Sequence, residues 1–513
     1  MANHPDRPNL LFIFTDEQRA DTMAAYGNND IRTPNLNLLS KQSFVFENAY
    51  ASQPVCTSSR STILTGTYPH TNGCTSNNIA LHRDAKTIAE MVSGDYRRGY
   101  YGKWHLGNDL QPQHGFEEWL TIEDVYRSYY SDKGDLDRYS DYHQYLIEQG
   151  YEPDCAGDEL DPTEEGAPQT DTGDSRMVFS RMFAANLPAE QTKAAFLGRR
   201  VEQFIHESAS DPRPFMLYAN SLEPHPPFTG PNDKLHRTNR NNEGDSFLSP
   251  PPENTSMINR VHANHLAHTK EQGEDFSKDA SWRRLRSRYF GLVASVDEAL
   301  GGILKALEDS GQAQNTIIVF TSEHGEMMGD HRMLYKSSMY QEAIRVPLLV
   351  RVPWLEEGSR TISGSISHID LVPTLLELLG ERIPGHLQGE SRLPVILGDT
   401  DLSGNDVVVQ WNGEDGRHQH CPIDFQNDFS QKLYDEIKGL PWRTIMTSDG
   451  WKLSINRIDQ CELYNLNNDP YETSNLYAHV AERDRVRDLV SRIRLWQERH
   501  KDYIQVLPED WGV

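Results

Sequence analysis

Short apolar runs alternate with helix-like segments along most of the chain, and this alternation constrains the possible fold more than any other feature of the sequence. Four runs have the length and the aliphatic or aromatic content of buried strands, namely residues 9–14, 214–219, 316–320 and 346–352. Strands that alternate with helices are typical of α/β proteins with a largely parallel sheet. We therefore expect a large, mostly parallel central sheet flanked by helices.

The pattern predicts helices at residues 34–48, 84–94, 190–208, about 281–310 and 368–376. A further short helix is expected to begin close to Cys56, because residues 57–59 are all of types that commonly cap helix N-termini. Gly66 suits the left-handed conformation just past a helix end. This reading places the Cys56 thiol at the positive end of a helix, with Arg60 on the same face. Such a thiol is either reactive or, as most lone cysteines are, a buried structural residue.

The pattern changes after about residue 395. Residues 407–411, 444–446 and 452–455 resemble short antiparallel strands, and an amphipathic helix follows at about 479–501. We therefore divide the chain into a larger α/β domain at residues 1–395 and a smaller C-terminal subdomain, residues 396–513, built from antiparallel strands and a helix.

Two long polar segments interrupt the α/β pattern. Residues 121–186 are acidic and rich in tyrosine, whereas residues 229–280 contain three consecutive prolines and several histidines without metal-ligand spacing. We interpret most of both inserts as solvent-exposed loops. The alternative is that they form lids that select a substrate.

Composition excludes some partners. Lys and Arg number 50 and Asp and Glu number 76, so the net charge is −26, which repels nucleic acids and anionic membranes. Five irregularly spaced cysteines predict no disulfide framework. No apolar run reaches the length of a membrane span, and the N-terminus lacks a signal-peptide pattern. We expect a cytoplasmic protein, with a removed signal peptide as the alternative.

Acidic residues follow two of the expected strands. Asp16 and Glu17 come directly after the run at 9–14, and Glu323 and His324 follow the run at 316–320. Ligands of open α/β sheets bind at the carboxyl ends of strands, and gathered carboxylates require a cation to stay ionised. Oxygen-rich ligands suit Ca²⁺, Mg²⁺ or Mn²⁺. The alternative is that each side chain faces solvent.

A second set of residues carries positive charge or can transfer protons: Arg60, Lys103, His105, His225 and Lys336. Each lies at an expected helix start, strand end or loop. Together they could hold a tetrahedral oxyanion and supply an acid, although each one alone resembles an ordinary surface residue.

Residues 56–66 resemble the signature of the type I sulfatases, of the alkaline-phosphatase superfamily, in which a cysteine in the pattern Cys-x-Pro/Ala-x-Arg is oxidised to formylglycine, an aldehyde. The resemblance extends, in the family's order, to residues 9–16, 33–36, 102–107, 224–227, 321–336 and 463–476. It implies an alkaline-phosphatase-like fold and a sulfuric ester hydrolase.

The resemblance also implies a role for each candidate residue. The hydrate of a formylglycine made from Cys56 would attack sulfur, and Arg60 would hold that hydrate. A divalent metal, with Ca²⁺ the first choice, would be bound by Asp16, Glu17, Glu323 and His324.

The remaining candidates would serve the transferred sulfate and the protons. Lys103 and Lys336 would offset charge on the sulfate oxygens. His225 would protonate the leaving alcohol, and His105 would help to deprotonate the second hydroxyl.

Three departures from the family pattern are visible. Ser58 stands where Pro or Ala is usual, and Glu17 and Glu323 stand where Asp is commoner. His324 is the variant also found in members that resemble phosphonate monoester and phosphodiester hydrolases, so such a hydrolase is the second hypothesis. An inactive binding protein is the third.

The expected substrate is a small sulfated saccharide or an aryl sulfate, and the expected partner is a maturation enzyme that generates formylglycine.

Overall fold

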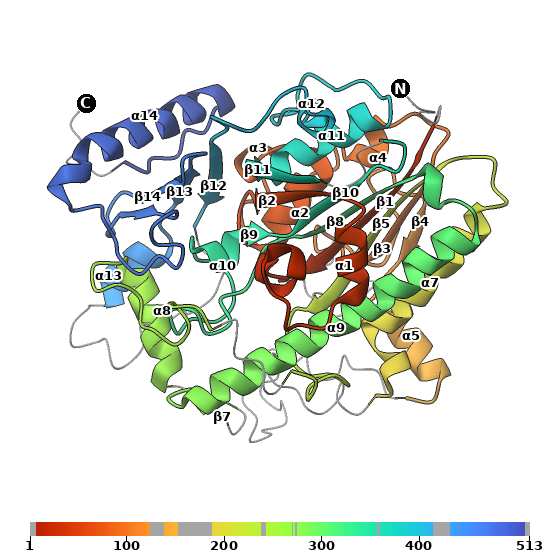
Figure 1. Cartoon of the computed structure of the whole chain (residues 1–513), viewed down its shortest axis with the longest axis horizontal. Coiled ribbons are helices and arrows are strands. Elements are labelled where there is room, and N and C mark those ends of the chain that lie inside the picture. Colours follow the sequence, from red (N-terminus) through yellow and green to blue (C-terminus); the bar gives the residue numbers. More distant parts are fainter. Residues whose placement is uncertain are drawn as a thin grey trace.

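A large mixed sheet forms the centre of the computed structural model, which describes residues 7–123, 138–151, 187–236, 243–268, 270–271, 274–355, 360–413 and 431–507. Within these residues the strand order is β11-β2-β10-β8-β1-β5-β3-β4, with β9 paired to β2 (Figure 1). The strands are β1 (Asn9–Asp16), β2 (Phe44–Tyr50), β3 (Arg97–Gly102), β4 (Glu118–Leu120), β5 (Phe215–Pro224), β8 (Thr316–Ser322), β9 (Arg345–Val346), β10 (Leu348–Arg351) and β11 (Arg360–Ser367).

The sheet is mostly parallel, as predicted. Strand β1 lies at its centre and pairs in parallel with both β5 and β8. All eight residues of β1 are buried, which explains why it reads as a continuous apolar run. The run at 346–352 forms β9 and β10, and β10 is antiparallel to β8 and to β2.

Helices cover both faces of the sheet because side chains along each strand alternate between them. Leu10, Phe12 and Phe14 pack on one face, where α2 and α11 lie, whereas Leu11 and Ile13 pack on the opposite face. The helices that cover that second face include α1, α7 and α9 (Figure 1). The helices named here are α1 (Pro34–Ser40), α2 (Cys56–Thr65), α7 (Lys193–Ser208), α9 (Asp279–Asp309) and α11 (Leu371–Leu378).

The prediction of one helix over residues 34–48 is wrong in its second half. Helix α1 ends at Ser40, and Phe44 begins strand β2. Phe44, Val45 and Phe46 are all buried, because their side chains pack on both faces of the sheet. Consecutive aromatic and β-branched residues favour such a strand. The helix predicted at 84–94 shrinks to α4 (Ile88–Met91).

A second sheet lies in the C-terminal part of the chain, as predicted. Its four antiparallel strands run in the order β12-β13-β14-β15. Helix α14 packs its apolar side against this sheet (Figure 1). The elements are β12 (Val407–Trp411), β13 (Trp442–Met446), β14 (Trp451–Ile455), β15 (Glu462–Asn465) and α14 (Arg483–His500).

The insert at 229–280 is less loop-like than expected. It contains α8 (Met257–His268), which contacts α13 (Gln431–Lys438) through Val261. The backbone N–H groups of Met257 and Ile258, at the start of α8, donate to the Asp459 carboxylate. This part of the insert therefore packs against the C-terminal subdomain.

The insert at 121–186 lies mainly outside the described residues, which include its short helix α5 (Asp141–Glu148). Among the described helices, none combines the length and the apolar character that a membrane span requires.

Candidate active site

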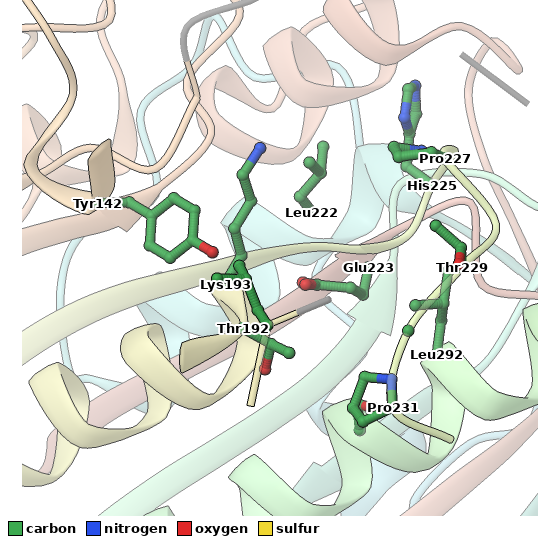
Figure 2. A pocket seen from close by; sticks show the side chains of 13 residues that line it. Tyr142, Thr192, Lys193, Leu222, Glu223, His225, Pro227, Thr229, Pro231 and Leu292 are labelled. Carbon is green, nitrogen blue, oxygen red and sulfur yellow. The ribbon is translucent and has the colours of Figure 1, made fainter. Parts of the chain in front are cut away.

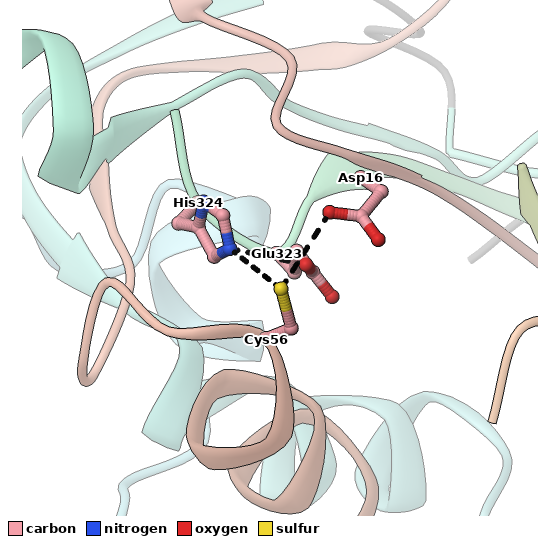
Figure 3. A group of neighbouring side chains, drawn as sticks. All are labelled: Asp16, Cys56, Glu323 and His324. Atoms are coloured by element: carbon pink, nitrogen blue, oxygen red, sulfur yellow. Dashed lines mark hydrogen bonds and ion pairs between the residues drawn. The ribbon is translucent and has the colours of Figure 1, made fainter. Parts of the chain in front are cut away.

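The predicted metal ligands lie together at the carboxyl edge of the central sheet. Asp16 ends β1, and Glu323 and His324 come directly after β8, the parallel neighbour of β1. Cys56 approaches them from the start of α2 (Figure 3). Its sulfur lies 3.4 Å from His324 Nε2 and 3.9 Å from Asp16 Oδ1. Adjacent parallel strands thus join residues that are about 300 positions apart in sequence.

Helix α2 begins at least two residues earlier than its capping residues at 57–59 suggest. Its N-cap is Val55, which provides no side-chain cap, and Cys56 is already the first helical residue. All ten residues of the helix are buried. Gly66 follows with φ 64°, which is the predicted left-handed C-terminal conformation. The Cys56 side chain therefore lies in the first turn of a fully buried helix, where the helix dipole favours negative charge.

Arg60 connects the helix to the strand ends. Its guanidinium donates to Lys103 O at 2.5 Å, to Asn220 Oδ1 at 2.6 Å and to Asp16 Oδ2 at 3.1 Å, and it pairs with Glu323. The side chain is fully buried. A planar guanidinium can satisfy several acceptors at fixed angles, which a lysine cannot.

A second group of contacts surrounds Glu17. Its carboxylate pairs with Lys336 and lies 3.4 Å from His225 Nε2. Glu17 has φ 68°, which is rare for a residue with a side chain, and its carbonyl accepts a hydrogen bond from Tyr289 Oη at 2.6 Å. The left-handed backbone turns consecutive residues Asp16 and Glu17 toward different cations, since Lys103 Nζ lies 2.7 Å from Asp16 Oδ2.

Burial and charge act in opposite directions on the acidic groups. Burial alone would raise the pKa of Asp16, but Lys103, His225 and Arg60 lower it well below the usual value. Burial would likewise raise the pKa of Glu17, yet Lys336 and His225 lower it to about 2. Both carboxylates are therefore ionised at neutral pH.

The histidines differ from one another. Burial lowers the pKa of His225 to about 4, although Glu17 and Asp16 act in the opposite direction. Burial, together with Lys103 and Arg60, lowers the pKa of His105 well below its usual value. For His324 burial is outweighed by Cys56 and Glu323, which raise its pKa to about 10. His105 Nε2 lies 2.8 Å from Asn78 Oδ1.

The chemistry of these donors fits a divalent cation. One ligand atom from each of Asp16, Cys56, Glu323 and His324 lies within 4.8 Å of the others, and the same holds for a set containing Glu17 and His225. Both carboxylate oxygens of Glu323 and the Oε2 atom of Glu17 are buried and accept no hydrogen bond from the described residues. Buried carboxylate oxygens of this kind are suited to a hard cation such as Ca²⁺ or Mg²⁺.

Sequence reasoning missed several residues that complete the site. Asn220 accepts from Arg60 and donates to Phe14 O at 2.9 Å. Glu326 is buried near Glu17, and its pKa is raised well above the usual value by burial and by the Glu17 charge. Asn220 directly follows the strand predicted at residues 214–219, so its position at the sheet edge was the available signal. Nothing local in the sequence distinguishes Asn78 or Tyr289.

A pocket borders the loop that carries His225 (Figure 2). Its walls come from α5, α7, β5 and α9, and its polar residues include Lys193 and Glu223. In Figure 2 the His225 ring points away from these two side chains. Of the predicted site residues, only His225 is among those that line this pocket. The pocket therefore adjoins the cluster around Cys56 through His225.

Comparisons with known proteins identify the family of the chain. Residues 8–381 match the family model described as Sulfatase. The N-acetylglucosamine-6-O-sulfatase of Bacteroides thetaiotaomicron is 26% identical over 519 residues, covering 97% of this chain and 87% of that protein.

Two solved structures share the fold. The phosphonate monoester hydrolase SpPMH from Silicibacter pomeroyi has a TM-score of 0.75 and 20% identity, covering 97% of this chain and 96% of that one. BT4656, in complex with its substrate D-glucosamine-2-N,6-O-disulfate, has a TM-score of 0.68 and 21% identity, covering 97% of this chain and 99% of that one. From the family match over most of its length, the chain belongs to the sulfatase family, within the alkaline-phosphatase superfamily.

Proposed function

We propose that this sulfatase-family hydrolase releases inorganic sulfate from a small sulfated saccharide or an aryl sulfate, using a formylglycine made from Cys56 and a divalent cation. The observation that carries the proposal is the position of Cys56. Its sulfur lies among carboxylate and imidazole ligands, in the first turn of α2 and one helical turn from Arg60. A nucleophile at that point would stand between a bound cation and the positive side chains.

The aldehyde and the cation would supply distinct chemistry. When hydrated, the aldehyde offers one hydroxyl to attack sulfur and a second whose deprotonation expels sulfate and restores the carbonyl. A cation held by Asp16, Glu17, Glu323 and His324 would lower the pKa of the attacking hydroxyl and polarise a sulfate oxygen.

Side chains of the protein would stabilise the charge on sulfate and transfer the protons. Lys103 and Lys336 are buried beside Asp16 and Glu17, where they can offset charge on the non-bridging sulfate oxygens. The negative charge of a bound sulfate ester would raise the pKa of His225 toward neutrality, so that it can protonate the leaving oxygen. His105 stays neutral at pH 7, the form needed to accept a proton.

The proposed substrate class is supported by the curated relative that acts on a 6-O-sulfated N-acetylglucosamine, which matches nearly the full chain. The strongly acidic composition favours a small substrate over a long polyanion. Hydrolysis of a phosphonate monoester or a phosphodiester is the second candidate, favoured by the histidine at position 324 next to Cys56.

One experiment addresses the nucleophile. Protein co-expressed with a formylglycine-generating enzyme should show, by mass spectrometry, an aldehyde in the peptide that contains Cys56. An unmodified thiol in every active preparation would refute the proposed mechanism.

A second experiment addresses the reaction. Specificity constants should be compared for an aryl sulfate, an aryl phosphonate and a phosphodiester with the same leaving group. We expect the sulfate to be the best substrate, and a sulfate that is poorest by orders of magnitude would favour the second candidate. Lys103→Ala and Lys336→Ala should lower turnover more than thermal stability.

A further inference from the structure

The catalytic lysine Lys336 is carried by a loop without helix or strand structure. This loop, residues 323–340, connects β8 to α10 (Gln341–Ile344). Tyr335 and Ser337, on either side of Lys336, both have left-handed φ values, 68° and 71°. Such backbone conformations cost energy in non-glycine residues and persist only where surrounding contacts impose them. Because the lysine side chain is itself flexible, its position depends on the backbone that carries it.

Contacts within residues 1–395 hold the two residues that flank Lys336, namely Tyr335 and Ser337. The backbone N–H of Tyr335 donates to the Glu326 carboxylate, and the Tyr335 carbonyl accepts from Met327 N at 2.9 Å. The Ser337 N–H donates to Pro54 O at 3.3 Å, close to Cys56 in the sequence.

Two residues from the C-terminal part of the chain, Lys452 and Glu472, hold the backbone farther along, at Met339 and Gln341. Lys452, on β14, donates from Nζ to the Met339 carbonyl and forms an ion pair with Glu472. The second carboxylate oxygen of Glu472 accepts from Gln341 N at 2.7 Å. The side chains of Lys452 and Glu472 are each 1% exposed. Two backbone groups within five residues of Lys336 are therefore fixed by one buried ion pair between Lys452 of β14 and Glu472, which follows β15 in the sequence.

An aromatic contact accompanies this anchor. The ring of Tyr340 stacks on His331 of the same loop at 4.0 Å between centroids. The Tyr340 side chain packs with Tyr464 of β15. The loop thus meets the C-terminal sheet through both polar and apolar groups.

A buried ion pair is weak evidence for stability, because desolvation of the two charges offsets their attraction. Its charged atoms do, however, require specific hydrogen-bond partners. Here those partners are the Met339 carbonyl and the Gln341 N–H. We propose that Lys452 and Glu472 are positioning residues, which hold the 339–341 segment so that Lys336 stays in contact with Glu17. The inference rests on the role proposed for Lys336.

The kinetic test compares two substitutions in the same strand. Lys452→Met removes the anchor, whereas Leu453→Ala removes a buried side chain on the opposite face of β14, within the cluster that packs against α14. At matched fraction folded, we expect Lys452→Met to lower kcat/KM at least tenfold and Leu453→Ala to change it less than twofold. Equal losses in the two variants would overturn the proposal.

A double-mutant cycle separates positioning from a general effect. In a Lys336→Ala background, Lys452→Met should change kcat/KM less than twofold, because the group it positions is already gone. Additive losses would contradict the proposal. If Lys452→Met does not fold, Glu472→Gln is the variant to use in the same cycle, with the same non-additivity expected.

Hydrogen exchange tests the anchor without any measurement of activity, so it does not depend on the proposed function. In Lys452→Met or Glu472→Gln, hydrogen exchange should accelerate in the peptide that contains residues 337–344, while strands β1 and β8 stay protected. Leu453→Ala should leave that peptide unchanged. Faster exchange in a protein without sulfatase activity would refute the function and keep the structural anchor, whereas unchanged exchange would refute the anchor.

Discussion

At the scale of single residues, the site is organised by one carboxylate with two cationic partners. Asp16 Oδ2 accepts from Lys103 Nζ and from Arg60, while Asp16 Oδ1 faces the Cys56 sulfur. The Oδ2 atom is thus held by two cationic side chains, and the Oδ1 atom is directed at the proposed nucleophile. The Glu323 carboxylate lies beside the same position; among the described residues it accepts no hydrogen bond but forms ion pairs with Arg60 and His324.

This arrangement predicts a response to divalent cations. Chelator-treated protein should gain thermal stability when Ca²⁺, Mg²⁺ or Mn²⁺ is added, by about 2.7 kcal/mol at a hundredfold excess over Kd. Differential scanning fluorimetry measures the shift. Glu323→Gln should weaken the response, whereas Glu326→Gln, at a buried carboxyl group that favours its protonated form, should keep it. An equal response in both variants would argue against a cation at this position.

Ser58 permits a second prediction at this scale. Its hydroxyl is buried and makes no hydrogen bond with the described residues. Ser58→Ala should therefore leave the free energy of unfolding unchanged or raise it by up to about 1 kcal/mol. It should also increase the fraction of Cys56 converted to aldehyde, since it restores the usual sulfatase pattern; intact-peptide mass spectrometry gives that fraction.

Thr57→Ala is the matched control for Ser58→Ala. The Thr57 hydroxyl donates to His105 O at 2.9 Å, so its removal should destabilise the protein by about 1–3 kcal/mol. If Ser58→Ala lowered the free energy of unfolding as much as Thr57→Ala, the Ser58 hydroxyl would have a hydrogen-bond partner in solution.

At the scale of elements, helix α2 is constrained by its neighbours along its whole length. It is buried along its whole length and ends at Gly66, where an added Cβ would lie 2.9 Å from both Leu387 Cδ2 and Val372 Cβ. Val372 belongs to α11, which packs on the same face of the sheet. The end of α2 is therefore set by its neighbours as well as by its own cap.

Gly66→Ala and Gly73→Ala together test this conclusion. Both glycines follow a helix with positive φ, 64° and 88°, so both substitutions carry the strain of about 1 kcal/mol that a side chain meets there. Gly73 has nothing within 4 Å of an added Cβ. We expect Gly66→Ala to cost at least about 1 kcal/mol more in urea denaturation. Similar costs would mean that α11 moves aside freely.

Helices and strands could be predicted from the sequence where the pattern of apolar residues fits only one type of element. Strands β1, β5 and β8 are buried on both faces and read as apolar runs, and the site acids at their ends followed from that assignment. The segment Phe44–Tyr50 was misread because its apolar residues fit a helix as well as a strand, and only its pairing with β10 and β11 distinguishes them.

Site residues could be predicted only where they lay in a segment that resembles a sulfatase motif or directly after a predicted strand. Asn220 and Asn78 were missed because a buried amide has no local signature, and its importance comes from the partner that folding brings to it. The N-cap at Val55 was missed for a similar reason. Tertiary packing, rather than a capping side chain, determines where α2 begins.

At the scale of the whole molecule, distant segments are joined by buried polar contacts. His236 Nε2 accepts from Arg32 N at 3.1 Å, which joins the 229–280 insert to the segment before α1. Between the larger domain and the C-terminal subdomain, His70 contacts both Gln410 and His500. The contact at His236 makes the stability of the molecule depend on pH.

The His236 contact predicts an acid-dependent loss of stability. Burial lowers the pKa of His236 to about 4, whereas an unfolded chain has a histidine pKa of about 6.5. Above pH 6.5 both states are neutral. As the pH falls from 6.5 to 4, the unfolded chain binds a proton that the folded protein excludes, so up to about 3 kcal/mol of stability is lost.

His236→Gln should reduce the stability difference between pH 7 and pH 4.5 relative to the unsubstituted protein, as measured by urea denaturation at each pH. The comparison isolates His236 from the other titrating groups, since these are the same in both proteins. Equal pH dependence in the two proteins would mean that His236 is solvated and protonated in the folded state.

The contact between the C-terminal sheet and the loop of Lys336 also bears on the timing of synthesis. Chain growth runs from the N-terminus, so Cys56, Lys103 and Lys336 leave the ribosome well before Lys452 and Glu472. A nascent chain can therefore assemble the central sheet while its reaction centre is still incomplete. A chain that ended after β11 but before residue 472 would keep the central sheet and the proposed cation ligands but would lack the Lys452–Glu472 pair. We expect such a chain to turn over slowly, so the last tenth of the sequence would act as a check on the quality of the product.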